Sequence, residues 1–412
     1  MKELLQKARA ASRQLAALNT AQKNAALLEI ARQLQEPENV RLILAENKKD
    51  TDAAEQSGIT AALLDRLTLT EARLAAIADS VREVAELPDP VGQGETFTRP
   101  NGLKIINTRV PMGVVAVIYE ARPNVTVDTA ALCLKSGNSA VLRGSSSAIN
   151  SNRAITAIMR KALAAVGLPQ DAVCFIDDIS RETTRELMTA RGLIDLLLPR
   201  GGRGLINFVC ENSTVPVIQT GAGVCHVYVD KSADIEMAAD LVFNAKCSRP
   251  SVCNAAETLL VHRDIAAQAL PVIAARLLEK NTELRGCPET LGILPRAVPA
   301  TEEDWSTEYG DYILSVRVVG SLDEAVSHIA RYSTGHSEAI VTRDYASASE
   351  FTERVDSACV YVNASTRFTD GGEFGFGSEI GISTQKLHVR GPVGLRHLVT
   401  NKYIVLGSGQ VR

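Results

Sequence analysis

Val114–Gly144 reads VVAVIYEARPNVTVDTAALCLKSGNSAVLRG, and its pattern predicts the class of fold. Val114–Tyr119 is a continuous apolar run rich in β-branched residues, which is typical of a strand buried on both faces. A helical pattern follows at Val127–Lys135, and Ala140–Leu142 is predicted to be a second strand. A strand, a helix and a strand in this order form a right-handed parallel βαβ unit. We therefore expect a parallel sheet covered by helices.

The same alternation of strands and helices continues along most of the chain. It runs first to Cys210 and then, after the glycine-rich turn Thr220–Gly223, from Val227 to Val355. Because 412 residues exceed what one hydrophobic core usually supports, we assign the alternation to two doubly wound α/β domains. The further predicted elements are strands at 173–176, 194–198, 227–229, 258–262, 316–319 and 339–341, and helices at 154–166, 181–190, 205–210, 265–278, 322–330 and 347–355.

Two segments fall outside this alternation. Residues 2–77 carry apolar side chains at intervals of three and four, which predicts amphipathic helices. Gly94–Gly113 alternates around a Pro-Asn-Gly turn and is predicted to form a β-hairpin. A strand is also predicted at Lys402–Leu406. This strand could pair with the hairpin, and we expect such a small sheet to join subunits.

Composition and charge argue against several classes of function. The net charge is −4, Lys and Arg are scattered, and aromatic residues make up 4% of the chain, so binding to nucleic acid or to an anionic membrane is not expected. No apolar run approaches the length of a membrane span, and the charged first residues are unlike a signal peptide, so we expect a cytoplasmic protein. The eight cysteines lack paired spacing, which favours reduced thiols over disulfides or a metal site.

One loop offers the chemistry of a nucleophilic cysteine. Asn244–Glu257 reads NAKCSRPSVCNAAE, and its Arg-Pro-Ser centre interrupts the helix predicted before it. A thiol reacts as the thiolate, whose formation is favoured by nearby cations such as Lys246 and Arg249. We predict Cys253 as the nucleophile and keep Cys247 as the alternative, since Cys247 directly follows an apolar helical run. Either thiol could instead be an ordinary small core residue.

Two turns are candidates for binding an anionic group. Arg143–Ser145 (RGS) and Arg200–Arg203 (RGGR) each follow a predicted strand of the first domain. Glycines let backbone N–H groups approach a phosphate, and the arginines add charge. The carboxyl ends of parallel strands also form the usual ligand crevice of such a sheet. Neither turn matches a phosphate-binding motif, so ordinary strand-to-helix turns are an equal alternative.

Six longer motifs carry a family resemblance. They are PMGVVAVIYEARPNVT from Pro111, LKSGNSAVLRG from Leu134, LPRGG from Leu198, RPSVCNAAETLLVH from Arg249, HIARYSTGHSEAI from His328 and VYVNASTRFTDGGEFGFGSEIGISTQKLH from Val360. With them the chain resembles the aldehyde dehydrogenase superfamily along nearly its whole length. The resemblance implies an aldehyde dehydrogenase-like fold of two doubly wound α/β domains and a small β oligomerisation element. It places the dinucleotide-binding domain at 1–97 and 112–226, the catalytic domain at 227–390, and the oligomerisation hairpin and tail strand at 98–111 and 391–412.

The resemblance also implies roles for individual residues. Cys253 corresponds to the catalytic nucleophile, and Glu308 to the carboxylate that holds the nicotinamide ribose. Without the resemblance, Glu308 would be taken for a solvated acid and the arginines for surface cations. The implied substrate-binding residues are Arg249, Ser365, Thr366 and Arg367, and the implied dinucleotide contacts are Arg143, Gly144, Ser145, Gly201 and Gly202.

Two departures from the superfamily's pattern bear on the reaction. Hydrolytic members carry a glutamate before the paired glycines of the turn at Gln219–Gly223, and this chain has none there, so a thioester would escape hydrolysis. The asparagine that donates to the oxyanion lies farther upstream in the superfamily than Asn124 does here, and a gapless register puts Glu120 in its place. Asn124 is therefore one candidate donor, and the backbone N–H of Cys253 is the other.

Within the superfamily, the motifs from His328 and Val360 resemble the branch that reduces an acyl phosphate. The implied reaction is the NADPH-dependent conversion of L-glutamyl 5-phosphate to L-glutamate 5-semialdehyde through a cysteine thioester, with release of phosphate, in proline biosynthesis. The implied partners are further copies of the chain, as a homodimer or homotetramer, and a glutamate 5-kinase in a transient complex. A CoA-acylating aldehyde dehydrogenase and a non-catalytic protein of the same fold are the alternatives.

Overall fold

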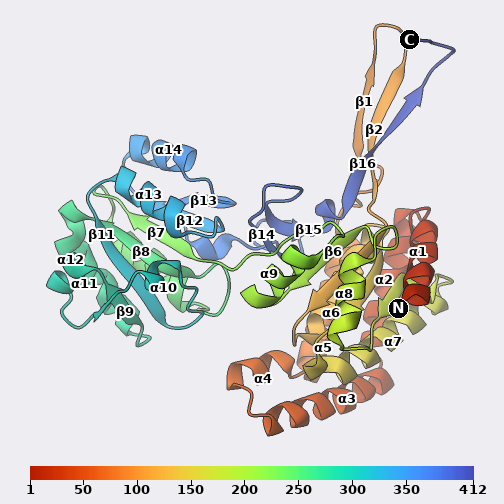
Figure 1. Ribbon diagram of the computed structural model, residues 1–412, viewed down its shortest axis with the longest axis horizontal. Helices are drawn as coiled ribbons and strands as arrows, with labels where there is room; N and C mark the ends of the chain where they lie inside the picture. Colours follow the sequence, from red (N-terminus) through yellow and green to blue (C-terminus); the bar gives the residue numbers. More distant parts are fainter. The chain divides into compact units, whose positions relative to one another are not determined.

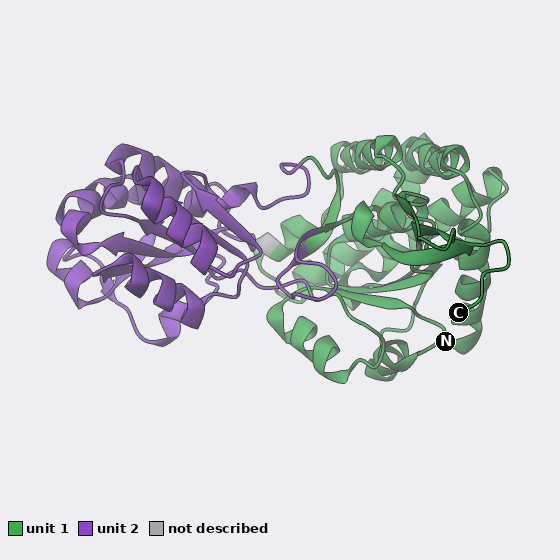
Figure 2. Cartoon of the chain, turned by 90° about the horizontal axis from the view of Figure 1, so that it is seen from above, with its two compact units in different colours: residues 1–219, 375–381, 393–412 green, residues 220–374, 382–392 purple. Residues whose placement is uncertain are grey.

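The computed structural model describes residues 1–412, except for the side chains of residues 61 and 62. The chain divides into two compact units, which are coloured separately in Figure 2. Unit 1 contains Met1–Gln219, Gly375–Gly381 and Val393–Arg412, and unit 2 contains Thr220–Phe374 and Ile382–Pro392. Each unit has a parallel sheet of its own, so the predicted α/β class with parallel sheets is confirmed.

The main sheet of unit 1 has four parallel strands in the order β5-β4-β3-β6. They are β3 (Val114–Tyr119), β4 (Ser139–Arg143), β5 (Val173–Phe175) and β6 (Leu196–Arg200). Every residue of β3 is buried, as expected for a central strand made of one apolar run. In the register of β3, Ile118 lies opposite Arg143 and Tyr119 lies opposite Arg200. Both predicted anion-binding turns therefore lie at the same carboxyl edge.

Helices surround this sheet, and one face of it packs against α1, α8 and α9. Leu5, Leu187 and Val209 from these helices join the strand residues Val114 and Ile118 in one core cluster. Helix α6 begins at Pro123 and not at the predicted Val127, because the fixed φ of proline suits the first helical position. The helices of unit 1 are α1 (Lys2–Leu15), α2 (Thr20–Gln35), α3 (Pro37–Gln56), α4 (Ala61–Leu67), α5 (Glu71–Glu86), α6 (Pro123–Lys135), α7 (Ile149–Ala165), α8 (Arg181–Thr189) and α9 (Arg203–Asn212).

A second, antiparallel sheet of unit 1 joins the predicted hairpin to the end of the chain (Figure 1). It contains β1 (Gly94–Thr98), β2 (Lys104–Pro111) and β16 (Val399–Leu406), with β2 in the middle. Tyr403 of β16 lies opposite Asn107 of β2. The hairpin and its pairing with the tail strand are therefore confirmed. All side chains of β1, and all of β16 after its first residue, are exposed.

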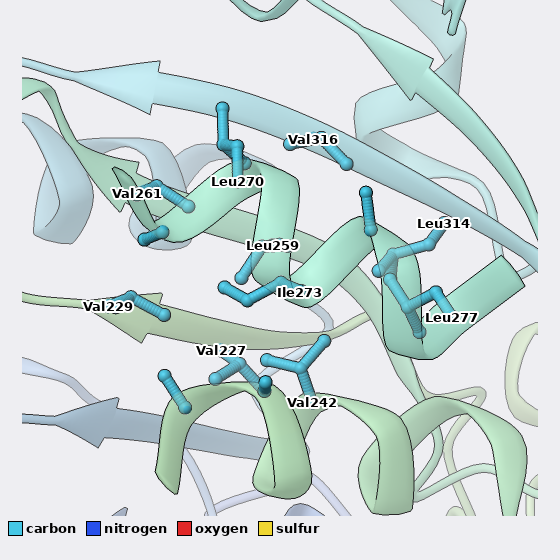
Figure 3. Packing of buried hydrophobic residues seen from close by; sticks show 14 of the residues in the cluster. Val227, Val229, Val242, Leu259, Val261, Leu270, Ile273, Leu277, Leu314 and Val316 are labelled. Atoms are coloured by element: carbon cyan, nitrogen blue, oxygen red, sulfur yellow. The ribbon is translucent and has the colours of Figure 1, made fainter. Parts of the chain in front are cut away.

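Unit 2 is built on a seven-stranded parallel sheet in the order β10-β9-β11-β8-β7-β12-β13. All residues of β7 and β8 are buried, and alternate side chains point to opposite faces of the sheet. Val227 and Leu259 pack with α10 and α11 on one face, as Figure 3 shows, whereas Tyr228 and Leu260 pack with α13 and α14 on the other. The strands are β7 (Cys225–Val229), β8 (Ala256–His262), β9 (Glu283–Gly286), β10 (Val298–Pro299), β11 (Ile313–Val319), β12 (Ser337–Val341) and β13 (Cys359–Val362).

The helices of unit 2 are α10 (Ile235–Cys247), α11 (Arg263–Leu278), α12 (Pro288–Ile293), α13 (Leu322–Tyr332) and α14 (Tyr345–Arg354). The sequence prediction missed β9, β10, α12 and β13, because these elements are too short to show a hydrophobic period. A two-stranded sheet of β14 (Glu379–Ser383) and β15 (Gly391–Gly394) follows.

None of the described helices is long and apolar enough to cross a membrane.

Candidate active site

The predicted nucleophile loop connects α10 to β8 in unit 2. Helix α10 ends at Cys247 and β8 begins at Ala256, so residues 248–255 form the loop. Cys253 is half-buried, whereas Cys247 is buried and its Sγ lies 3.4 Å from Oγ1 of Thr282. Burial raises the pKa of Cys247, which disfavours the thiolate that a nucleophile needs. The geometry therefore favours Cys253 over Cys247.

The main chain of Cys253 packs against the turn that precedes β7. A Cβ atom on Gly223 would lie 1.4 Å from the carbonyl oxygen of Cys253, so only glycine fits at this position. The thiol of Cys225 donates to the same carbonyl oxygen at 3.3 Å. The backbone N–H of Gly223 donates to Oε1 of Glu308 at 2.9 Å. The turn therefore supports the nucleophile loop and also brings the carboxylate of Glu308 next to that loop.

Asn254, which the sequence analysis did not single out, fixes the other side of the nucleophile. Its carbonyl oxygen accepts a hydrogen bond from Oγ1 of Thr366 at 2.7 Å. Its Nδ2 donates to the carbonyl oxygens of Thr369 at 3.0 Å and of Arg367 at 3.3 Å. The residue after the nucleophile is thus bonded to the segment 365–369, where substrate-binding residues were predicted. Only its place beside Cys253 could have pointed to it in the sequence, because its partners lie more than a hundred residues away.

Arg367 lies across the nucleophile loop. Its Nε donates to Oγ of Ser248 at 3.1 Å, and its guanidinium also bonds to Oδ1 of Asn254. Burial lowers the pKa of Arg367, and the charge of Arg249 lowers it further. The structure therefore brings two of the predicted substrate-binding cations, Arg249 and Arg367, into electrostatic contact at the loop that carries Cys253. A pair of cations is suited to an anionic substrate group.

The two other predicted substrate-binding residues are buried, and their hydroxyls bond within the protein. Ser365 caps the short helix Thr366–Phe368 by accepting from the backbone N–H of Arg367 at 3.3 Å. Thr366 is fully buried and holds Asn254 as described above. These bonds give both side chains a role in shaping the loop, and their contact with substrate stays a prediction.

In unit 1, the turn after β4 has polar atoms that suit a polar ligand. Nε of Arg143 and Oγ of Ser145 are buried without a hydrogen-bond partner among the described residues. Gly144 is packed so closely that a Cβ atom there would lie 2.3 Å from Nδ2 of Asn152. Buried polar groups normally find a partner, so unpartnered ones at the carboxyl edge of a sheet fit a dinucleotide that supplies it.

The turn after β6 lies at the same edge, and Glu120 packs on it. A Cβ atom on Gly201 would lie 2.5 Å from the carboxyl carbon of Glu120, whereas Gly202 has more room. Asn124 lies in the first turn of α6, where its Nδ2 donates to Oδ2 of Asp128 at 3.0 Å. An amide nitrogen carries two N–H groups, so the predicted role of Asn124 as an oxyanion donor is compatible with this bond. Among the residues that the structure describes, no group of three or more His, Cys, Asp or Glu side chains is placed to hold a metal ion.

Comparisons with known proteins agree with this geometry. The model of the aldehyde dehydrogenase family matches residues 1–285. The chain is 58% identical over 410 residues to a γ-glutamyl phosphate reductase of Carboxydothermus hydrogenoformans, covering 99% of this chain and 98% of that protein. It is 57% identical over 408 residues to one of Moorella thermoacetica, with coverage of 99% and 97%. The crystal structure of γ-glutamyl phosphate reductase from Thermotoga maritima matches with a TM-score of 0.97 at 49% identity and covers 100% of this chain and 99% of that chain.

The fold and the matched model place the chain in the aldehyde dehydrogenase family, which confirms the resemblance seen in the sequence. Within that family, the full-length relatives show that it belongs to the γ-glutamyl phosphate reductases, so it is an enzyme of the aldehyde dehydrogenase class. An acetylating aldehyde dehydrogenase from Geobacillus thermoglucosidasius shares the fold with a TM-score of 0.71 at 19% identity. That lower identity supports the shared fold alone.

Proposed function

We propose that the chain catalyses the NADPH-dependent reduction of L-glutamyl 5-phosphate to L-glutamate 5-semialdehyde, with release of phosphate, in proline biosynthesis. One observation carries the proposal: a half-buried thiol, Cys253, has its main chain held by Gly223 and Cys225, and the residue after it is held by Thr366, in a chain whose full-length relatives are named γ-glutamyl phosphate reductase. We propose that unit 1 binds the dinucleotide and that unit 2 carries the covalent chemistry.

In this mechanism the Cys253 thiolate attacks the acyl carbon of the substrate. A carbon–sulfur bond forms, the carbon–oxygen bond to the phosphate breaks, and inorganic phosphate leaves with the bonding electrons. The product is a γ-glutamyl thioester on Cys253. The carbonyl oxygen becomes negative in the transition state, and we propose that it accepts from the backbone N–H of Cys253 and, as a second donor, from the amide of Asn124.

NADPH, when bound, supplies the reducing equivalent that converts the thioester to the aldehyde. In unit 1 we propose that Arg143, Gly144 and Ser145, together with Gly201 and Gly202, line the dinucleotide, and in unit 2 that Glu308 holds the nicotinamide ribose. The charge of the arginines at the edge of the unit 1 sheet supports NADPH over NADH. Release of the aldehyde breaks the carbon–sulfur bond and restores the Cys253 thiolate. The thioester survives until then because the turn before β7 lacks the water-activating glutamate of hydrolytic family members.

We propose that Arg249 and Arg367 bind the α-carboxylate of the glutamyl group. The support is that both cations lie at the loop that carries the nucleophile, and that partial burial of Arg367 strengthens its attraction for an anion. We assign Ser365 and Thr366 to the same part of the site, where they shape the segment that carries Arg367.

The acceptor of the acyl group distinguishes this function from its alternatives. In the reverse direction, wild-type protein with glutamate semialdehyde and NADP is expected to form NADPH only when phosphate is added, as followed by absorbance. Turnover that ignores phosphate but rises with CoA would assign the chain to a CoA-acylating activity. Absence of turnover with either acceptor would favour a non-catalytic protein.

Because an acyl phosphate is labile, a transient complex with the glutamate 5-kinase that supplies it is also proposed. A mixture of the two proteins in size-exclusion chromatography is expected to elute earlier than either alone when the kinase is turning over. Independent elution under turnover at micromolar concentrations would contradict the complex.

A further inference from the structure

Two oppositely charged side chains are buried together at the base of the nucleophile loop. Lys246 lies in the last turn of α10, and Glu257 is the second residue of β8, so the pair brackets the loop that carries Cys253. Nζ of Lys246 lies 2.6 Å from Oε2 of Glu257, and the two side chains are 0% and 1% exposed. The contact therefore joins the two ends of the loop.

The same carboxylate also reaches the turn that carries Glu308. Oε1 of Glu257 accepts a hydrogen bond from the backbone N–H of Gly310 at 3.2 Å. Gly310 has a φ of +63°, a conformation that glycine adopts easily, so the chain turns sharply just after Glu308. Nζ of Lys246 also lies 5.9 Å from the centre of the Tyr309 ring. The buried pair thus holds the two residues that follow Glu308.

The turn 308–310 is also connected to the nucleophile, through Glu308. Oε1 of Glu308 accepts from the backbone N–H of Gly223, and Gly223 packs directly on the carbonyl oxygen of Cys253. A continuous series of contacts therefore runs from Glu257 through the turn 308–310 and Gly223 to Cys253. Every step of it lies within unit 2.

Stability alone is a weak reason for burying such a pair. Removing two charges from water costs more than their attraction usually returns, and well-packed apolar residues often serve as well. Burial raises the pKa of Glu257 to about 7 even though Lys246 and the N–H of Gly310 favour its charged form. A group kept at such a cost is better explained by the contacts that it makes.

We infer that Lys246 and Glu257 are positioning residues that fix the turn carrying Glu308 relative to both ends of the nucleophile loop. The inference rests on the proposed role of Glu308 in holding the nicotinamide ribose. Through these contacts the buried carboxylate of Glu257 fixes both the orientation of the Glu308 carboxylate and the position of Cys253. Neither residue of the pair needs to touch the substrate or the cofactor.

Two double variants distinguish the effect of the hydrogen bond to Gly310 from the effect of the buried charges. Lys246→Met with Glu257→Leu removes both charges and the acceptor, whereas Lys246→Met with Glu257→Gln removes the charges but keeps an oxygen for the N–H of Gly310. The affinity for NADPH, measured by fluorescence titration without substrate, is expected to fall about tenfold or more in the first pair and clearly less in the second. The alkylation rate of Cys253 by iodoacetamide is expected to follow the same order.

A second buried ion pair, which lies away from the nucleophile loop in the sequence, provides the control for the general effect of removing a buried ion pair. Nζ of Lys23 lies 2.5 Å from Oδ2 of Asp89 in unit 1, and Lys23 is 2% exposed. Lys23→Met with Asp89→Asn is expected to leave NADPH affinity and Cys253 alkylation unchanged. Equal losses in this control and in the variant that combines Lys246→Met with Glu257→Leu would reduce the effect to general stability and overturn the inference.

Glu308→Gln and Glu257→Asp complete the experiment. If Glu308→Gln weakens NADPH binding but neither Lys246/Glu257 pair of substitutions does, the inference is overturned while the proposed function stands. If Glu308→Gln binds NADPH as the wild type does, the proposed role of Glu308 fails, and the inference fails with it. Should the paired variants not fold, Glu257→Asp keeps the charge but shortens the side chain so that it cannot reach both partners, and wild-type affinity in that variant would overturn the inference.

Discussion

At the scale of single residues, the site depends on close contacts to the main chain of the nucleophile. The carbonyl oxygen of Cys253 is covered by Gly223 and accepts from the thiol of Cys225, and the next residue is held by Thr366. Such contacts leave the thiol in one place relative to the donors of its loop. Small displacements of a reacting atom carry large rate penalties, so each contact is open to test.

Gly223→Ala is expected to disable the site without unfolding unit 2. The added methyl group would meet the carbonyl oxygen of Cys253 at 1.4 Å and push the loop away, so activity should fall about 100-fold or more. Gly292→Ala is the matched control, because a Cβ atom there meets nothing within 4 Å. Steady-state assays of the two variants, with circular dichroism to verify folding, make the comparison. Activity of Gly223→Ala within a factor of two or so of its control would refute the packing argument.

Arg367→Met is expected to raise the KM for the glutamyl substrate by about 10- to 100-fold, because a charge-assisted contact with the α-carboxylate is lost. The alkylation rate of Cys253 should fall by a smaller factor, since the variant removes a cation near the thiolate but methionine keeps much of the length of the side chain. Arg343→Met, which removes an exposed cation paired with Asp234, controls for loss of positive charge in unit 2. An unchanged KM would remove Arg367 from the substrate site.

At the scale of elements, the spacing of apolar residues correctly predicted the long and apolar elements, such as β3 over 114–119 and helix α11. The same reasoning predicted α6 but placed its start at Val127, because the first turn contains Pro123 and Asn124, and it missed β9 and β13, whose few residues show no period. For the site, the chemistry of Cys253 and the arginines was visible in the sequence. Asn254 and Glu257 were not, because their partners are brought to them only by the fold.

Helix α13 contains a buried histidine, which makes the stability of the protein depend on pH. His328 of α13 is 4% exposed, its ring centre lies 5.4 Å from those of His226 and Trp305, and its Nε2 has no partner among the described residues. Burial lowers the pKa of His328 to about 2, with smaller contributions from His226 and nearby arginines. The folded state therefore binds fewer protons than the unfolded state below the usual histidine pKa.

His328→Phe is expected to make the protein less sensitive to acid. For a histidine with a lowered folded pKa, stability is complete above about pH 6.5 and is lost as the pH falls below it. Between about pH 7.5 and pH 5 this one group should cost the wild type about 2 kcal/mol of unfolding free energy, which the variant should not lose. Urea unfolding of both proteins at the two pH values measures the difference. Parallel losses in the two proteins would show that His328 stays protonatable when folded.

At the scale of the whole molecule, the sheet of β1, β2 and β16 exposes apolar side chains that no part of the described chain covers. Phe97 is 45% exposed, Tyr403 62%, Val405 54% and Leu406 50%. Exposed apolar edge strands are an aggregation hazard unless a partner covers them. This sheet is therefore the proposed surface for assembly into a homodimer or homotetramer.

Light scattering is expected to give the mass of a dimer or a tetramer for the wild type. Val405→Lys, which places a charge on the edge strand β16, should shift the mass toward a smaller species, because an unpaired charge disfavours burial in an interface. Lys402→Ala on the same strand controls for substitution in β16 as such. A monomeric wild type at micromolar concentration would contradict the proposed role of this sheet.

The central claim is that Cys253 forms the covalent intermediate, and the reverse reaction tests it most directly. NADPH formation from glutamate semialdehyde and NADP, with phosphate present, is compared for the wild type, Cys253→Ala and Cys247→Ala. We predict that phosphate-dependent turnover is abolished in Cys253→Ala and retained in Cys247→Ala. Turnover that survives in Cys253→Ala would contradict the account, and its loss only in Cys247→Ala would move the nucleophile to the end of α10.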